Sequence, residues 1–163
     1  MTMRIVVMGV SGCGKSTVGK MLASKLSAKF VDGDDLHPEE NKAKMAAGIA
    51  LNDDDRWGWL DSVAATLESA DRVIVACSAL KVVYRERIEA ASPGTVFVHL
   101  SGSRSVLESR LNNRKEHFMP ASLLDSQLST LQPLGPDELG VVIDIDKSID
   151  SIVDEALSFL KLG

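Results

Sequence analysis

Residues 9–16 read GVSGCGKS, and this stretch decides the fold. It matches the phosphate-binding pattern G-x-x-x-x-G-K-[ST] without a gap. The apolar, β-branched run at residues 4–8 (RIVVM) predicts a buried strand before it, and apolar residues at helical spacing over residues 15–26 predict a helix after it. A strand, a glycine-rich turn and a helix in that order are the context that the pattern requires. We therefore expect this turn to hold the phosphates of a nucleotide.

Each residue type in the turn has a physical task. Glycines let backbone amides point inward around phosphate oxygens, and the following helix adds the positive end of its dipole. Lys15 offers an ammonium to the β- and γ-phosphates, and Ser16 offers a hydroxyl ligand to Mg²⁺. ATP and Mg²⁺ are therefore the expected ligands. The predicted nucleotide contacts here are Gly9, Val10, Ser11, Gly12, Cys13, Gly14, Lys15, Ser16 and Thr17.

Apolar runs alternate with helical patterns along the rest of the chain. Further strands are predicted at residues 29–31, 72–77, 95–100 and 141–145, and further helices at residues 53–70, 81–90, 103–113 and 149–160. Alternation of this kind requires crossover connections, which give a parallel sheet with helices on both faces. The sequence thus predicts one three-layer α/β domain of five strands over residues 1–163. Strand order does not follow from the spacing.

Composition narrows the class of protein. The chain has 163 residues, 45% of them hydrophobic, and a formal net charge of -5, which argues against a nucleic-acid partner. No apolar run is long enough to predict a membrane span, and the apolar N-terminal stretch is too short for a signal peptide. Cys13 and Cys77 suggest neither a disulfide framework nor a zinc site. A cytoplasmic protein is expected.

Acidic residues follow the second predicted strand. In many ATPases the third strand ends in a carboxylate that serves the metal, but here it ends at Cys77 and Ser78. Asp32 and Asp34 lie where a strand meets the ligand crevice, so we expect them to replace that carboxylate. Our first choice is that Asp32 supports the metal and Asp34 orients or deprotonates an acceptor hydroxyl, and the two roles are exchangeable at this point. An Asp-rich, solvated turn is the alternative.

Several segments together resemble one family along nearly the full length. They are GVSGCGKS (9–16), DGDDLHP (32–38), NKAKMAAG (41–48), LNDDDRWGWL (51–60), CSALKVVYR (77–85), ESRLNNRKEHFM (108–119) and LSTLQ (128–132). The chain is similar to thermoresistant-type gluconate kinases, relatives of shikimate kinase and the nucleoside monophosphate kinases. The resemblance implies the P-loop NTPase fold with strand order 2-3-1-4-5 and a helical lid at about residues 112–132. It also implies phosphorylation of D-gluconate by ATP and Mg²⁺, and commonly a homodimer.

Gluconate is a polyol with a carboxylate, so its site needs cations and hydrogen-bonding groups. Arg56, Lys81 and Arg85 are the candidate cations, and we expect Arg56 and Arg85 to hold the carboxylate and the growing phosphate ester between them, with either arginine on either group. An exposed helix face is the alternative for Lys81 and Arg85. Lys81 and Arg85 are four apart and are expected on one helical face. The resemblance implies that His37 contacts sugar hydroxyls. Asp53 is expected to cap the helix that begins there.

Basic residues follow the fourth strand. Arg110 and Arg114 are four apart on a predicted helix and resemble the lid arginines of small kinases, which close over the phosphates. We expect both to be catalytic, with Arg110 also contacting ATP. Adenine is expected between this helix and residues 146–148, so Lys147 joins the predicted ATP contacts.

Two other functions compete with gluconate phosphorylation. A shikimate kinase would carry a Gly-Gly-Gly stretch after the third strand, where this chain has CSAL at residues 77–80, and a nucleoside monophosphate kinase would need a base pocket that nothing in residues 32–60 indicates. A nucleotide-binding sensor without turnover is the other rival. The presence of Lys15, Ser16, an acidic pair and basic lid residues argues against it.

Overall fold

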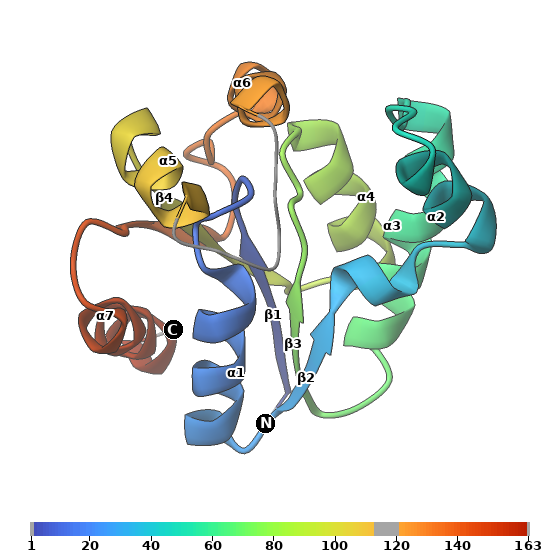
Figure 1. The fold of residues 1–163 in the computed structure, drawn as a ribbon. Coiled ribbons are helices and arrows are strands. Elements are labelled where there is room, and N and C mark those ends of the chain that lie inside the picture. The colour runs from blue at the N-terminus through green and yellow to red at the C-terminus, as the bar shows by residue number, and fades with distance from the viewer. Residues whose placement is uncertain (1, 113–120, 163) are drawn as a thin grey trace.

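The computed structural model describes residues 2–112 and 121–162. Five parallel strands form one sheet in the order β2-β3-β1-β4-β5, which confirms the order implied by the resemblance (Figure 1). The strands are β1 (Met3–Met8), β2 (Lys29–Asp32), β3 (Arg72–Ala76), β4 (Val96–Ser101) and β5 (Gly140–Asp144). Each differs from its predicted range by at most one residue at either end.

Helices cover both faces of the sheet, as predicted. Helices α1 (Lys15–Leu26) and α7 (Ile149–Leu162) pack on one face, and α3 (Asp53–Leu67) and α4 (Val82–Ala91) pack on the other (Figure 1). The central strand β1 serves both cores by strict alternation. Ile5 and Val7 face the core under α1 and α7, while Val6 and Met8 face the core under α3 and α4. A continuous apolar run is what a strand covered on both faces needs.

Three helical elements have no counterpart in the sequence prediction as separate elements. They are the short 3₁₀ helix η1 (Gly33–Leu36), α2 (Glu39–Ala46) and α6 (Ala121–Thr130), which follows α5 (Arg104–Asn112) across a stretch outside the described residues. The single buried residue of α2 is Asn41, so this helix has no apolar stripe from which it could be predicted. No helix in the described part of the chain is both long and apolar enough to cross a bilayer.

Gly33 sets the distance between the acidic segment and the sheet. It begins η1 directly after β2 and is buried against the end of β3. A Cβ at this position would lie only 2.4 Å from the carbonyl oxygen of Ala76. Only glycine therefore lets the segment that carries Asp32 and Asp34 turn so close to β3.

Replacing Gly33 by alanine tests this close approach. We expect Gly33→Ala to lower the free energy of unfolding by about 1–3 kcal/mol, since backbone atoms must move to accept the methyl group. Gly58 is the matched control, because it lies inside α3 and an added Cβ meets nothing within 4 Å. Gly58→Ala should raise stability by about 0.5–1 kcal/mol. Urea unfolding of both variants measures the difference, and equal effects would contradict the packing argument.

Candidate active site

The loop between β1 and α1 has the geometry of a phosphate cradle. Gly12 and Gly14 have φ values of 88° and 90°, and Gly14 is the N-cap residue of α1. Such left-handed conformations favour glycine and turn consecutive amides toward one side. The Lys15 ammonium donates hydrogen bonds to the carbonyl oxygens of Gly9 at 3.0 Å and Val10 at 3.3 Å. The cation is therefore held across the loop, close to the amides that would face an anion.

Both cysteines are packing residues. The Cys13 side chain is buried, and its Sγ lies so close to Gly9 that a Cβ there would sit 2.7 Å from it. Cys13 can thus contribute to the loop only through its backbone. Burial raises the pKa of the Cys77 thiol to about 12. That thiol stays protonated near neutral pH and is a poor nucleophile.

A hydrogen bond joins the loop to the acidic segment. The Ser16 hydroxyl donates to Asp32 Oδ2 at 3.2 Å, and the Asp34 backbone N–H donates to Asp32 Oδ1 at 3.0 Å. Asp32 is therefore fixed between the start of α1 and the start of η1. The structure brings together the two groups that the sequence assigned to the metal. Within the described residues, no cluster of three or more His, Cys, Asp or Glu side chains has metal-binding geometry.

Asp34 lies next to this junction and remains exposed at its surface. Partial desolvation and the nearby Asp32 carboxylate raise the pKa of Asp34, while the Lys15 ammonium opposes that rise. A carboxylate with a raised pKa is a better proton acceptor than an ordinary surface aspartate. Hydrogen bonds thus hold the Asp32 carboxylate in place, while the pKa of Asp34 is raised above its ordinary value.

His37 follows η1 and is only 7% exposed. Its ring stacks on Trp59 with 4.2 Å between ring centroids and 13° between planes. The Trp59 indole N–H donates to the Gly33 carbonyl at 2.7 Å, which ties the stack to η1. Burial, together with the charges of Arg56 and Lys42, lowers the pKa of His37 to about 4. His37 is therefore neutral at physiological pH.

A second cluster forms where α3 begins beside α4. The Lys81 ammonium lies 3.1 Å from Asp53 Oδ1, and Tyr84 donates its hydroxyl proton to the same carboxylate. Arg56 in turn donates to the Tyr84 hydroxyl at 3.0 Å. The Tyr84 hydrogen bond and the Lys81 ammonium lower the pKa of Asp53. Arg56 and Lys81 thus lie together, each partly exposed.

The expectation that Asp53 caps α3 is wrong. The N-cap residue is Asn52, whose side chain accepts from the Asp55 amide at 2.8 Å while Asp55 accepts from the Asn52 amide at 3.0 Å. This reciprocal pair is a capping box. It leaves the Asp53 carboxylate to pair with Lys81 instead.

Arg85 is not available to a substrate carboxylate in this structure. Its side chain is 1% exposed and pairs with Glu138, with 2.6 Å from Nε to Oε1 and 3.1 Å from Nη2 to Oε2. The guanidinium also donates to the carbonyl oxygens of Ala79 and Gln132. Lys81 does not share its helical face, because Lys81 is the extended N-cap residue of α4 and Arg85 points into the protein. Arg85 therefore ties the loop after β3 to the segment after α6.

Arg110 reaches from α5 to the loop after β5. Its Nη2 donates to the Ile145 carbonyl at 2.7 Å, and Nη1 lies near Gly14 at the end of the phosphate loop. A pocket of about 420 Å³ lies here, where adenine was expected. It is lined by Ser105, Val106, Ser109, Arg110, Ile145, Asp146 and Lys147. Arg114 lies outside the described residues.

Two residues that hold the site together, Gln127 and Gln132, were assigned no role from the sequence. Gln127 of α6 accepts a hydrogen bond from the Ser11 amide at 2.7 Å, so α6 contacts the phosphate loop directly. Gln132 accepts from the Val82 amide at 2.7 Å and secures the start of α4. Both contacts join segments 50 or more residues apart in the sequence, and no local pattern predicts them.

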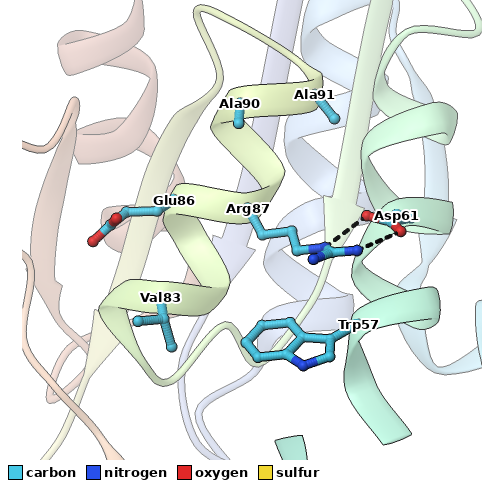
Figure 2. Close-up of a pocket in the computed structure, with 7 residues that line it drawn as sticks. All are labelled: Trp57, Asp61, Val83, Glu86, Arg87, Ala90 and Ala91. Atoms are coloured by element: carbon cyan, nitrogen blue, oxygen red, sulfur yellow. Dashed lines mark hydrogen bonds and ion pairs between the residues drawn. The ribbon is translucent and has the colours of Figure 1, made fainter. Parts of the chain in front are cut away.

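Another pocket, of about 590 Å³, lies on the outer side of α3 and α4 (Figure 2). Arg87 crosses it to form two 2.9 Å hydrogen bonds with Asp61, and its guanidinium lies over the Trp57 ring (Figure 2). None of the site residues predicted from the sequence lines this pocket. It is separate from the candidate active site.

Comparison with known proteins decides the family. A shikimate kinase family model matches residues 11–161. A probable gluconokinase of Xenopus tropicalis is 46% identical, over 94% of this chain and 90% of that protein, and the thermoresistant gluconokinase of Escherichia coli K12 is 44% identical, over 97% and 93%. This chain belongs to the gluconokinase family. A crystal structure of a gluconokinase from Sinorhizobium meliloti 1021 superposes with a TM-score of 0.92 at 47% identity, covering 98% of this chain and 92% of that one.

Family membership agrees with the sequence after β3, where residues 77–80 read CSAL in place of the Gly-Gly-Gly stretch expected of a shikimate kinase. The broader shikimate kinase model describes the domain, and the much more similar relatives carry the gluconokinase name. The resemblance found from the motifs is thereby confirmed, as is the P-loop kinase fold. The chain is a kinase.

Removing Glu138 tests the structural task of Arg85. We expect Glu138→Ala to cost about 3–5 kcal/mol of unfolding free energy, since it leaves a buried guanidinium without its counter-charge. Glu89→Ala on the exposed face of α4 is the control, with an expected change within about 0.5 kcal/mol. Chemical denaturation measures both. A Glu138→Ala variant of wild-type stability with a raised KM for the acceptor would instead assign Arg85 to substrate binding.

Proposed function

We propose that this protein transfers the γ-phosphoryl group of ATP to D-gluconate, giving ADP and 6-phospho-D-gluconate. The observation that carries the proposal is the continuous row of groups from the phosphate loop to the cation cluster. Ser16 donates to Asp32, the Asp34 amide donates to the same carboxylate, and the His37 amide donates to the Asp34 carbonyl at 3.5 Å. The Arg56 charge in turn acts on His37. Nucleotide and acceptor groups are thus neighbours along one edge. The gluconokinase relatives support the choice of acceptor.

Ser16 and Asp32 are the proposed Mg²⁺ ligands. They offer a hydroxyl and a carboxylate oxygen 3.2 Å apart. Such a pair fits Mg²⁺, which in kinases takes one or two protein oxygens and fills its other positions with phosphate oxygens and water. Held by these two residues, Mg²⁺ would supply positive charge to the phosphate oxygens of the nucleotide. Asp32 acts directly or through one of those waters.

Asp34 is the proposed proton acceptor. The acceptor hydroxyl oxygen forms a bond to the γ-phosphorus as the bond from that phosphorus to the β,γ-bridging oxygen breaks, and the hydroxyl proton passes to Asp34. The raised pKa of Asp34 suits this task. Lys15 and Arg110 lie on the phosphate side, where they stabilise the charge of the moving group.

The acceptor is held by groups on the other side of Asp34. We assign its carboxylate to Arg56 and Lys81, which lie together and are partly exposed, and we assign one of its hydroxyls to His37. Arg85 is left out of this set because its side chain is buried and its donors are bonded inside the protein, whereas Arg56 and Lys81 are partly exposed.

The nucleotide is proposed to lie along the loop from Gly9 to Thr17, with adenine in the pocket beside Arg110 and Lys147. We propose that about residues 112–132 act as a lid and bring Arg114 to the phosphates. The lid is part of a single domain over residues 1–163. Gln127 already links α6 to the loop at Ser11. A homodimer in the cytoplasm is the proposed working form.

An acceptor panel tests the function. ADP release coupled to a reporter reaction should be fast with gluconate and near background with shikimate, AMP or no acceptor. Lys15→Ala should lower kcat by about 10³-fold or more, because the ammonium that serves the β- and γ-phosphates is gone. Lys25→Ala, an exposed lysine on the same helix, is the matched control and should keep wild-type kinetics. Equal rates with gluconate and without acceptor would exclude the proposed substrate.

A further inference from the structure

Asn41 lies buried in the first turn of α2, four residues after His37, and is 3% exposed. Its Nδ2 lies 2.8 Å from the backbone carbonyl oxygen of Asp55 and 3.1 Å from His37 Nδ1. The side chain therefore bridges the histidine and the first turn of α3. None of the tasks proposed above uses it.

The Asp55 carbonyl determines which way round the Asn41 amide lies. A carbonyl oxygen can only accept a hydrogen bond, so the amide nitrogen must face it, because the reversed amide would set two acceptors against each other. An amide nitrogen carries two protons. One goes to the Asp55 carbonyl, and the other points at His37 Nδ1.

The tautomer of His37 follows from this arrangement. Nδ1 must present a lone pair to the Asn41 N–H, so the single proton of the neutral ring is on Nε2. An imidazolium would place two donors against each other. Within the described part of the chain Nε2 has no hydrogen-bond partner, and it is not among the fully buried polar atoms that lack one. Nε2 therefore keeps some exposure, and the Arg56 charge acts on this ring.

We propose that Asn41 is a positioning residue that holds His37 as a neutral Nε2–H donor for a lone pair of a substrate hydroxyl oxygen. His37 then has no free nitrogen lone pair with which to accept the hydroxyl proton. Proton acceptance is left to Asp34. Stacking on Trp59 fixes the plane of the ring, and Asn41 fixes the direction of its proton. This inference rests on the proposed function for the identity of the acceptor, but not for the tautomer.

The groups around His37 also favour the neutral ring. Arg56 lies at the start of α3 and Lys42 on α2, and burial and both cations lower the pKa of His37 to about 4. The nearby acidic groups are Asp34 and Asp35 on η1 and Asp55 on α3. The Asp55 carboxylate is paired with Lys44 at 2.8 Å. The neutral ring is therefore the form present near pH 7.

Nitrogen NMR reads the tautomer without any substrate. Protein labelled with ¹⁵N-histidine has three histidines, and His37→Gln identifies the signals of His37. At pH 7 we expect a protonated Nε2 and an unprotonated Nδ1 for this residue. In Asn41→Asp the carboxylate can only accept, so the proton should move to Nδ1. A wild-type spectrum with the proton on Nδ1 would overturn the inference, whichever acceptor the enzyme uses.

Kinetics test the consequence for the substrate. Asn41→Asp should lower kcat/KM for the acceptor by about 10- to 100-fold and leave the KM for ATP within about 2-fold. The reason is that the Asp55 carbonyl loses its donor, or His37 no longer presents an N–H to the substrate hydroxyl. Glu40→Gln makes the opposite exchange at the exposed neighbour and should have no effect. The amide nitrogen of glutamine can occupy the place of Nε2 but cannot take up a proton. His37→Gln should therefore retain at least about tenfold more kcat/KM than His37→Leu.

The outcomes separate the two proposals. If His37→Gln loses as much activity as His37→Leu, the donor role is wrong. If the wild type does not phosphorylate gluconate, the proposed function fails, while the NMR result still decides the tautomer. A predicted tautomer with unchanged kinetics in Asn41→Asp would overturn the positioning role.

Discussion

Parallel pairing of β1, β3 and β2 is the constraint on which the rest of the site depends. Val7 and Asp32 both pair with Ala76 of the strand between them, so the carboxyl ends of three strands reach one edge of the sheet. The loop after β1 and the acidic segment after β2 therefore meet, and the Ser16–Asp32 hydrogen bond closes their junction. Gly33 permits that closeness because it has no side chain.

Along this edge of the sheet, the pKa values of Asp34 and His37 are shifted in opposite directions. Desolvation raises the pKa of the carboxyl group of Asp34 and lowers that of the imidazole of His37, since burial disfavours the charged form of each. Opposite shifts in neighbouring groups are how one site separates a proton acceptor from a neutral donor. The buried guanidinium of Arg85 belongs to the frame instead, where it and Glu138 connect the loop after β3 to the segment after α6.

Local sequence patterns predicted the features that depend on local physics. The five strands, the phosphate loop and the position of Asp32 follow from apolar runs, glycine spacing and the direction of parallel strands. The task of Arg85 did not follow, because its partner Glu138 comes 53 residues later and helical spacing suggested only that Arg85 shares a face with Lys81. Asn41 was missed for a similar reason, since α2 is polar and its one buried residue contacts the start of α3. Side-chain contacts between distant segments leave no periodic signal.

The most direct test is a crystal structure of the protein with Mg²⁺, a non-hydrolysable ATP analogue and gluconate. We expect the triphosphate on the amides of the loop from Gly9 to Thr17, the Lys15 ammonium on phosphate oxygens, and the metal within reach of Ser16 and Asp32. The acceptor hydroxyl should lie between Asp34 and the γ-phosphate. A nucleotide bound elsewhere, with that loop making no contact to phosphate, would contradict the account at its base.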